Sequence, residues 1–182
     1  MLLSMREIKR RARRIKLLLM DCDGVLTDGR IYYLPYGRSG FMETKTFFAR
    51  DGLGIRYAHL AGIKTGIISG RGTPVVSHRV KELGIHFLYE GALDKLGPFN
   101  EIMRKAGIQE QEVCYMGDDV VDLPILERCG LAVGVGDSHP ALKRQVHYMT
   151  RANGGRGAVR ETIDLILAAQ GRLNAARQSY AS

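Results

Sequence analysis

The sequence predicts an α/β fold, a Rossmann-like three-layer sandwich in which helices cover both faces of a mainly parallel sheet. Three observations support this prediction. Short apolar runs alternate with helical patterns along most of the chain, an order typical of parallel sheets. The run Leu17–Met20 is apolar at every position, as expected of a strand buried on both faces. Polar residues follow several of these runs, at the sheet edge where open α/β sheets bind ligands.

The composition limits the class of protein. The chain has 182 residues, 45% hydrophobic and 25% charged, and we assign residues 1–182 to a single soluble domain. No apolar stretch approaches the length of a membrane span, and no secretion signal opens the chain. Three cysteines without metal-type spacing favour a reducing compartment. We therefore expect a cytoplasmic protein.

The net charge of +8 raises the question of nucleic-acid binding. Much of the excess lies in the basic stretch 6–16. A nucleic-acid-binding arm and the solvated face of a short helix both agree with this cluster. The helix is favoured, because no zinc-finger, RRM or KH signature accompanies the charge. The positive field also suits an anionic small molecule.

The first elements follow from local signals. Ser4 and Glu7 have the spacing of a capping box, which predicts a basic helix within residues 1–14. After the strand Leu17–Met20, aromatic and β-branched residues flank a turn-rich segment and predict a β-hairpin over 30–48. Asp51 is then expected to cap a helix that runs to Ala61.

The rest of the chain alternates strands and helices. The expected strands are Lys64–Ile68, His86–Tyr89, Val113–Met116, Leu131–Val135 and Val146–Met149. The expected helices are Thr73–Leu83, Asp94–Ala106, Val120–Cys129 and Ala158–Ala169. A glycine-rich loop precedes the last helix, so residues 153–182 form a tail with a carboxyl-terminal helix and a frayed polar end.

Candidate chemical groups gather at the carboxyl edge of the predicted sheet. They are Asp21 and Asp23 after the first strand, Ser69 and Gly70 after the second, Lys95 before the fourth, and Asp118, Asp119 and Asp122 after it. Clustered carboxylates need a cation, and hard oxygen ligands favour Mg²⁺. Hydroxyl and ammonium groups suit phosphate oxygens. The set predicts phosphoryl transfer, in which one carboxylate attacks phosphorus and another moves protons.

The ordered set resembles the haloacid dehalogenase (HAD) superfamily. D-C-D-G-V-L-T matches its first motif, and Ser69, Lys95 and G-D-D-V-V-D match the other three in order. Over about Ile15–Gly171, the chain more narrowly resembles the capless 3-deoxy-D-manno-octulosonate 8-phosphate (KDO 8-phosphate) phosphatases. R-D-G-x-G-I-R, Y-x-G-x-x-D-K-L and G-G-R-G-A-V-R-E carry this likeness. The resemblance implies a HAD fold whose insertion is only the hairpin, without a cap domain.

The resemblance also implies residue roles. Asp21 is expected to be the nucleophile and Asp23 the general acid/base. The implied Mg²⁺ ligands are the carboxylates of Asp21 and Asp118 and the backbone carbonyl of Asp23. Turn or capping roles are the structural alternative for the first two aspartates.

The remaining motif residues are implied to serve the phosphate. Ser69, Gly70 and Lys95 would bind it, while Asp119 and Asp122 would orient Lys95 or metal-bound water. Helix capping by Ser69 or Asp119 and a solvated Lys95 stay open as alternatives.

The implied reaction is hydrolysis of KDO 8-phosphate to KDO and phosphate, a step of lipopolysaccharide synthesis. Arg71, Arg79 and Arg156 are candidates for binding the sugar acid. A surface role is the alternative for Arg79. A nine-carbon keto-sugar acid 9-phosphate stays open as the substrate, although Arg71 favours the eight-carbon one, because relatives acting on the nine-carbon type can carry glutamate there.

The resemblance implies a homotetramer in which the hairpins associate and a neighbouring subunit helps cover each site. The segment Gly154–Gly157, with Arg156, is expected to fold over the bound sugar; a plain linker is the alternative. A phospho-receiver domain is disfavoured, because receivers carry the phosphorylated aspartate after strand three, where this chain has Tyr89-Glu90-Gly91.

Overall fold

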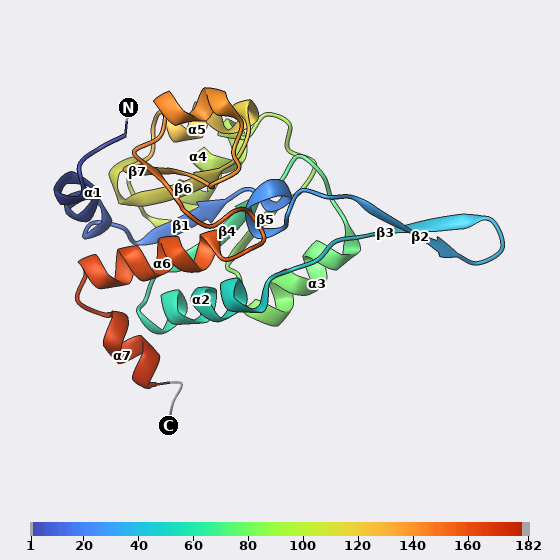
Figure 1. The fold of residues 1–182 in the computed structure, drawn as a ribbon, viewed down its shortest axis with the longest axis horizontal. Coiled ribbons are helices and arrows are strands. Elements are labelled where there is room, and N and C mark those ends of the chain that lie inside the picture. Colours follow the sequence, from blue (N-terminus) through green and yellow to red (C-terminus); the bar gives the residue numbers. More distant parts are fainter. Residues whose placement is uncertain (1, 180–182) are drawn as a thin grey trace.

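The computed structural model describes residues 2–179, which form three layers with one sheet in the middle (Figure 1). All neighbouring strands of this sheet are parallel, in the order β5-β4-β1-β6-β7-β8. The strands are β1 (Leu17–Met20), β4 (Lys64–Ile68), β5 (Phe87–Tyr89), β6 (Val113–Gly117), β7 (Leu131–Gly134) and β8 (Tyr148–Met149). The predicted α/β class and parallel sheet are confirmed.

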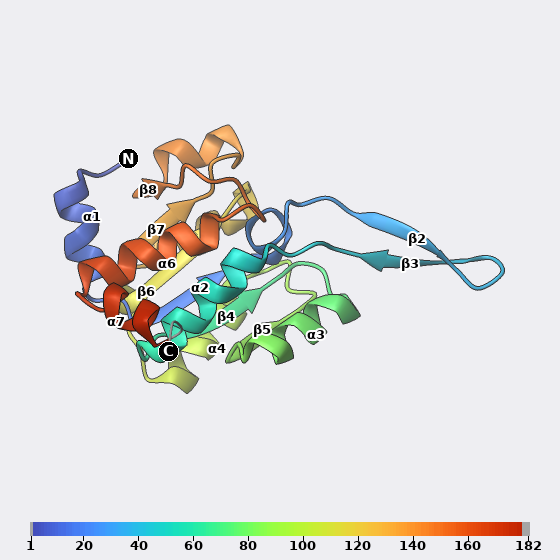
Figure 2. The same ribbon diagram turned by 60° about the horizontal axis from the view of Figure 1, so that its bottom comes forward.

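Helices cover both faces of the sheet. They are α1 (Met5–Ala12), α2 (Ala49–Leu60), α3 (Pro74–Leu83), α4 (Leu96–Ala106), α5 (Leu123–Leu126), α6 (Ala158–Ala169) and α7 (Leu173–Gln178). Buried residues of α1, α2, α3 and α6 share one apolar core, and those of α4 and α5 share the other. Figures 1 and 2 both show α2 and α6 side by side on the same face.

Strand β1 lies at the centre and determines where the chemistry occurs. Its four residues are all buried, and alternate side chains enter opposite cores: Leu18 faces one and Leu19 the other. Met20 pairs in register with Ile67 of β4 and Met116 of β6. The residues that follow these three strands therefore meet at one edge of the sheet.

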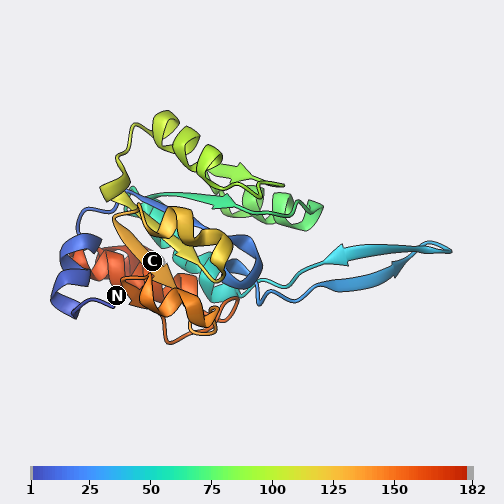
Figure 3. The same cartoon turned by 90° about the horizontal axis from the view of Figure 1, so that it is seen from above.

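The predicted hairpin is present and projects from the sandwich (Figure 3). Strands β2 (Tyr32–Tyr36) and β3 (Gly40–Thr44) pair in antiparallel register and form a separate two-stranded sheet. Its large apolar side chains are exposed, Tyr36 to 69% and Phe41 to 73%. Within residues 2–179, this hairpin is the only strand pair outside the main sheet.

Three local predictions differ from the structure. Helix α2 begins at Ala49, so Asp51 lies inside it and does not cap it. Its buried carboxylate instead accepts hydrogen bonds from the backbone N–H groups of Gly157 and Arg160, at 3.1 and 2.7 Å. Asp51 therefore satisfies the free amide groups at the start of α6, a different helix.

The predicted helix over Val120–Cys129 is shorter. It consists of the 3₁₀ turn Val120–Asp122 followed by α5, because the Asp122 carboxylate draws the preceding backbone into a tight turn. In the polar carboxyl-terminal segment, Leu173–Gln178 is helical and not frayed. The last three residues of that segment lie outside the described part of the chain.

Other predictions hold. Ser4 caps α1 by accepting the Glu7 N–H, which is one half of the predicted capping box; the Glu7 side chain pairs with Arg10 and Arg11 instead. Pro74 opens α3, and Gly84 closes it in the left-handed conformation. The three cysteines are free and buried. Among residues 2–179, no helix is both long enough and apolar enough to span a bilayer.

Candidate active site

A pocket of about 220 Å³ opens at the carboxyl ends of the central strands. It is lined by Asp21, Asp23, Gly70, Arg71, Ala92, Leu93, Lys95, Asp118, Asp119 and Val121. The predicted convergence of acidic residues and a lysine at this edge is thus seen in the structure. The pocket takes its walls from the loops after β1, β4 and β6 and from the approach to α4.

The loop after β1 turns sharply, and this turn orients the first two aspartates. Asp21 is extended, and its Oδ1 accepts the backbone N–H of Cys22 at 2.6 Å. Gly24 then adopts φ +89°. A Cβ atom at Gly24 would lie 2.1 Å from Oδ2 of Asp118, so only glycine allows the loop to approach that carboxylate.

Lys95 supplies a buried positive charge beside Asp21. Its Nζ lies 3.1 Å from Oδ2 of Asp21 and 2.7 Å from Oδ1 of Asp122. Asp122 is fully buried and also accepts hydrogen bonds from the Tyr115 hydroxyl at 2.7 Å and the Asp118 backbone N–H at 3.0 Å. Asp122 therefore holds Lys95 in position. Sequence reasoning did not identify Tyr115, which follows the apolar pattern of a core strand.

Asp21, Asp118 and Asp122 form an acidic cluster in which one carboxylate oxygen of each residue lies within 4.8 Å of those of the other two. Burial raises the pKa of Asp118 to about 8, and the charges of Asp21 and Asp122 add to the effect. Burial also raises the pKa of Asp21, to about 6, despite the opposing charge of Lys95. The cluster is therefore short of positive charge.

This donor set fits a hard divalent cation such as Mg²⁺. Oδ1 of Asp118 is buried without a hydrogen-bond partner. Both oxygens of Asp122 already accept hydrogen bonds, from side chains on one oxygen and from backbone N–H groups on the other. Each oxygen of Asp122 thus has two partners, whereas each oxygen of Asp21 has one and Oδ1 of Asp118 has none. Asp21 and Asp118 are therefore the carboxylates best placed to hold the metal.

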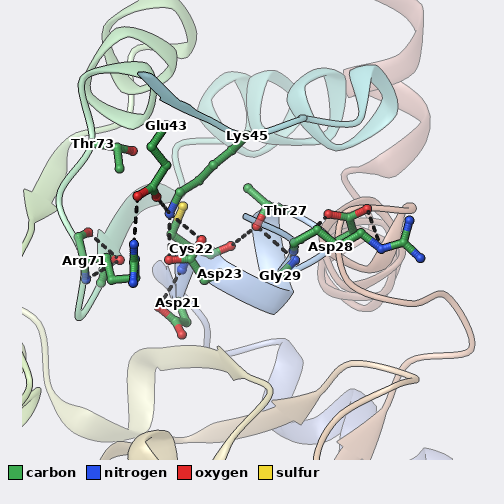
Figure 4. Close-up of polar contacts among 12 residues, drawn as sticks. Asp21, Cys22, Asp23, Thr27, Asp28, Gly29, Glu43, Lys45, Arg71 and Thr73 are labelled. Atoms are coloured by element: carbon green, nitrogen blue, oxygen red, sulfur yellow. Dashed lines mark hydrogen bonds and ion pairs between the residues drawn. The ribbon is translucent and has the colours of Figure 1, made fainter. Parts of the chain in front are cut away.

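Asp23 has a partner that sequence reasoning missed. The Lys45 Nζ lies 2.5 and 2.8 Å from the two carboxylate oxygens of Asp23, although Lys45 follows the hairpin (Figure 4). Glu43 lies between Lys45 and Arg71, with its Oε2 2.8 Å from Nη2 of Arg71. A lysine in the aromatic run 41–48 was the only sequence signal for this contact.

Of the three predicted phosphate-binding residues, two line the pocket and one does not. Gly70 and Lys95 line the pocket. Ser69 is buried, and its Oγ donates to the Arg71 carbonyl at 2.8 Å and accepts the Arg71 N–H at 3.2 Å. In this structure Ser69 shapes the loop that presents Gly70 and Arg71. Asp119 is exposed, and its side chain accepts the N–H of Val120, as expected of a cap.

The three candidate specificity arginines lie in different places. Arg71 lines the pocket. Arg79 does not: its guanidinium lies 5.6 Å from the centre of the Phe47 ring and 2.7 Å from Glu82, in a groove between α2 and α3. Arg156 is exposed, 3.9 Å from Asp28.

The glycine-rich segment is packed against the loop after β1. The Gly155 N–H donates to the Val25 carbonyl at 2.9 Å. A Cβ atom at Gly154 would lie 1.7 Å from the Gly24 carbonyl oxygen. The glycines of this segment therefore permit a close backbone contact with the loop after β1. Its folding over a bound sugar stays a prediction.

The fold and the site define a HAD-type hydrolase, and residues 86–163 match the haloacid dehalogenase-like hydrolase family. Over 167 residues the chain is 47% identical to the 3-deoxy-D-manno-octulosonate 8-phosphate phosphatase KdsC of Escherichia coli K12, covering 92% of this chain and 87% of that protein. The chain belongs to the family of KDO 8-phosphate phosphatases.

Solved structures agree. The Yersinia pestis phosphatase of the same name has a TM-score of 0.88 and 45% identity, covering 92% of this chain and 89% of that one. The Moraxella catarrhalis phosphatase, solved in complex with magnesium, phosphate and KDO, has a TM-score of 0.92 and 38% identity, covering 97% and 99%. The resemblance stated from the motifs is confirmed.

Proposed function

We propose that this protein is a Mg²⁺-dependent phosphomonoesterase that hydrolyses KDO 8-phosphate to KDO and phosphate. One observation carries the proposal: Asp21 and Asp23 lie between β1 and the turn at Gly24, and they line one pocket with Lys95 and Asp118. The near full-length similarity to phosphatases with this named substrate supports the choice of sugar.

The side chains divide the reaction between them. An Asp21 carboxylate oxygen attacks phosphorus in line, and the bond from phosphorus to the sugar oxygen breaks to leave an aspartyl-phosphate. Asp23 donates a proton to the departing sugar oxygen. Asp23 then takes a proton from water, which attacks the same phosphorus, releases phosphate and restores Asp21.

Positive charge stabilises both steps. The Lys95 ammonium, fixed by Asp122, neutralises charge that spreads over the phosphoryl oxygens. Mg²⁺ held by Asp21, Asp118 and the Asp23 carbonyl would add charge neutralisation and orient the phosphoryl group when bound. Gly70 lines the same pocket, and its backbone N–H is the group we expect to bind a phosphoryl oxygen.

Substrate choice is assigned to Arg71, which lines the pocket and can pair with the sugar-acid carboxylate. We expect kcat/KM for KDO 8-phosphate to exceed that for nine-carbon keto-sugar acid 9-phosphates by at least about tenfold. Phosphate release from a panel of sugar phosphates checks this. We expect Arg71→Ala to raise KM for KDO 8-phosphate and to reduce the difference in kcat/KM between the eight-carbon and nine-carbon substrates. Preference for a nine-carbon substrate would support the alternative phosphatase.

The product places the reaction in lipopolysaccharide precursor synthesis, and the free, buried cysteines agree with a cytoplasmic enzyme. Nucleic-acid binding by α1 has less support, because Arg10 and Arg11 pair with Glu7 of the same helix. The expected partner is the phosphorylated sugar acid.

We further propose a homotetramer that assembles through the hairpins. The exposed apolar side chains of this element are Ile31, Tyr33, Leu34, Tyr36, Phe41 and Met42. The strand register places Leu34, Tyr36 and Met42 on one face of the hairpin and Tyr33 and Phe41 on the other. Exposed apolar side chains on a projecting element are typical of a protein–protein interface. Association would also help to cover a pocket that the chain's own hairpin leaves open.

Charged substitutions in the hairpin test this assembly. We expect a Tyr36→Asp/Phe41→Asp variant to sediment as a smaller species than the wild type, because burying two carboxylates in an apolar interface is costly. Leu60→Asp is the control, since Leu60 is also exposed but lies on α2. An unchanged sedimentation coefficient in the hairpin variant would contradict the proposed interface.

A further inference from the structure

Lys45 has the unusual property of a fully buried ammonium group. Its side chain has 0% exposure, compared with 24% for the Asp23 side chain that it contacts. A buried charge is tolerated only where partners replace its water. Lys45 finds these partners in the active-site loop, where its Nζ bridges both carboxylate oxygens of Asp23.

The contact continues across three parts of the chain. Glu43 and Lys45 are two residues apart, so they point to the same side of an extended segment. Oε1 of Glu43 lies 3.8 Å from the Lys45 Nζ, and its Oε2 lies 2.8 Å from Nη2 of Arg71 (Figure 4). Asp23, Lys45, Glu43 and Arg71 thus form one line of alternating charge. The line joins the loop after β1, the end of the hairpin and the loop after β4.

We propose that Lys45 is a positioning residue for Asp23, held in place by Glu43, so that the base of the hairpin sets the geometry of proton transfer to the leaving oxygen. This inference rests on the function proposed above, and it concerns a residue outside the four HAD motifs. It also gives the hairpin a role within each subunit, separate from association between subunits.

The physical reason lies in the freedom of the Asp23 side chain. Proton transfer requires the donor and acceptor atoms to lie about 2.6–3.2 Å apart. Asp23 is partly exposed, and a carboxylate on such a loop can rotate away from this geometry. An ammonium that bridges both oxygens restricts that rotation. A displacement of about 1 Å is enough to reduce a rate by about 100-fold.

The test compares two leaving groups in a Lys45→Met variant. A sugar alkoxide is strongly basic and needs a proton as it leaves, whereas p-nitrophenolate leaves without one. Because kcat/KM reports only the steps up to aspartyl-phosphate formation, it isolates this difference. We expect kcat/KM to fall by about 100-fold with KDO 8-phosphate and by less than about fivefold with p-nitrophenyl phosphate.

Two further variants distinguish a loss of activity through Asp23 from a general loss of structure. Lys16→Met is the control, because Lys16 pairs with Glu112 ahead of β1, at the opposite end of that strand from Asp21. If Lys45→Met does not fold, Lys45→Gln takes its place, because it removes the charge and leaves the Glu43–Arg71 pair intact. Melting temperature and circular dichroism establish that each variant is folded.

The outcomes distinguish a failure of the positioning role of Lys45 from a failure of the proposed function. Selective loss with the sugar phosphate, together with an Asp23 side chain displaced in a crystal structure of the variant, supports the positioning role. If kcat/KM falls equally with both substrates, or with neither, the positioning role of Lys45 is overturned. The proposed function still stands in that case, provided that the wild type hydrolyses KDO 8-phosphate. A wild-type protein that hydrolyses neither substrate in the presence of Mg²⁺ instead refutes the proposed function.

Discussion

An Asp21→Asn variant is expected to release phosphate from KDO 8-phosphate at least about 10⁴-fold more slowly than the wild type. An amide oxygen is a far weaker nucleophile than a carboxylate oxygen, so the aspartyl-phosphate should not form. The two side chains are nearly isosteric. The substitution also removes one of the carboxylates that crowd Asp118, so the fold should be retained.

Two measurements check the nucleophile. The first is phosphate release by the purified variant in the presence of Mg²⁺, with its melting temperature as a test of folding. The second is an acid quench during turnover, which should trap a phosphorylated wild-type protein and no phosphorylated variant. Asp164→Asn is the matched control, because Asp164 pairs with Arg160 and Arg177 on the surface. Near-normal phosphate release by Asp21→Asn would refute the assignment.

The part of this site that lies on the parallel sheet was predictable from the sequence. Leu17–Met20 is a continuous apolar run, which limits it to a buried strand, and Asp21 follows it directly. The parallel pairing of β1 with β4 and β6 then brings Asp21, Gly70 and Asp118 to one edge. Such placement needs only strand order and direction, which local patterns and the HAD motifs indicate.

The contacts made by side chains across the fold were not predictable in this way. Lys45 contacts Asp23 although 22 positions and the whole hairpin separate them in the sequence. Asp51 looks like a cap for the helix around it, yet it caps α6, more than 100 residues further along the chain. Short-range rules assign a polar residue to its neighbours in sequence, whereas burial assigns it to its neighbours in space.

An Asp118→Asn variant is expected to lose activity while gaining stability in the absence of Mg²⁺. Asp118 is one of the two carboxylates best placed to hold the metal, so its loss should reduce turnover by about 10²–10³-fold. Without the metal, the same carboxylate lowers the stability of the folded protein. One of its oxygens is buried without a partner, beside the charges of Asp21 and Asp122.

The sign of the pH dependence follows from the pKa of Asp118, which burial and these neighbours raise from 3.8 to about 8 on folding. A carboxyl group whose pKa is raised on folding contributes stability at pH values below its pKa in the unfolded chain. This contribution is lost as the pH rises towards its pKa in the folded protein. The Mg²⁺-free wild type should therefore lose stability between about pH 4 and pH 8.

The comparison is made by denaturant unfolding with a chelator at the two ends of this range. At the upper end, Asp118→Asn should be more stable than the wild type by roughly 1–2 kcal/mol, less than the full shift implies because water reaches the site. Added Mg²⁺ should stabilise the wild type and not the variant. Added Mg²⁺ should stabilise the control variant Asp164→Asn as much as it stabilises the wild type. If Mg²⁺ stabilises Asp118→Asn as much as it stabilises the wild type, Asp118 is not a ligand.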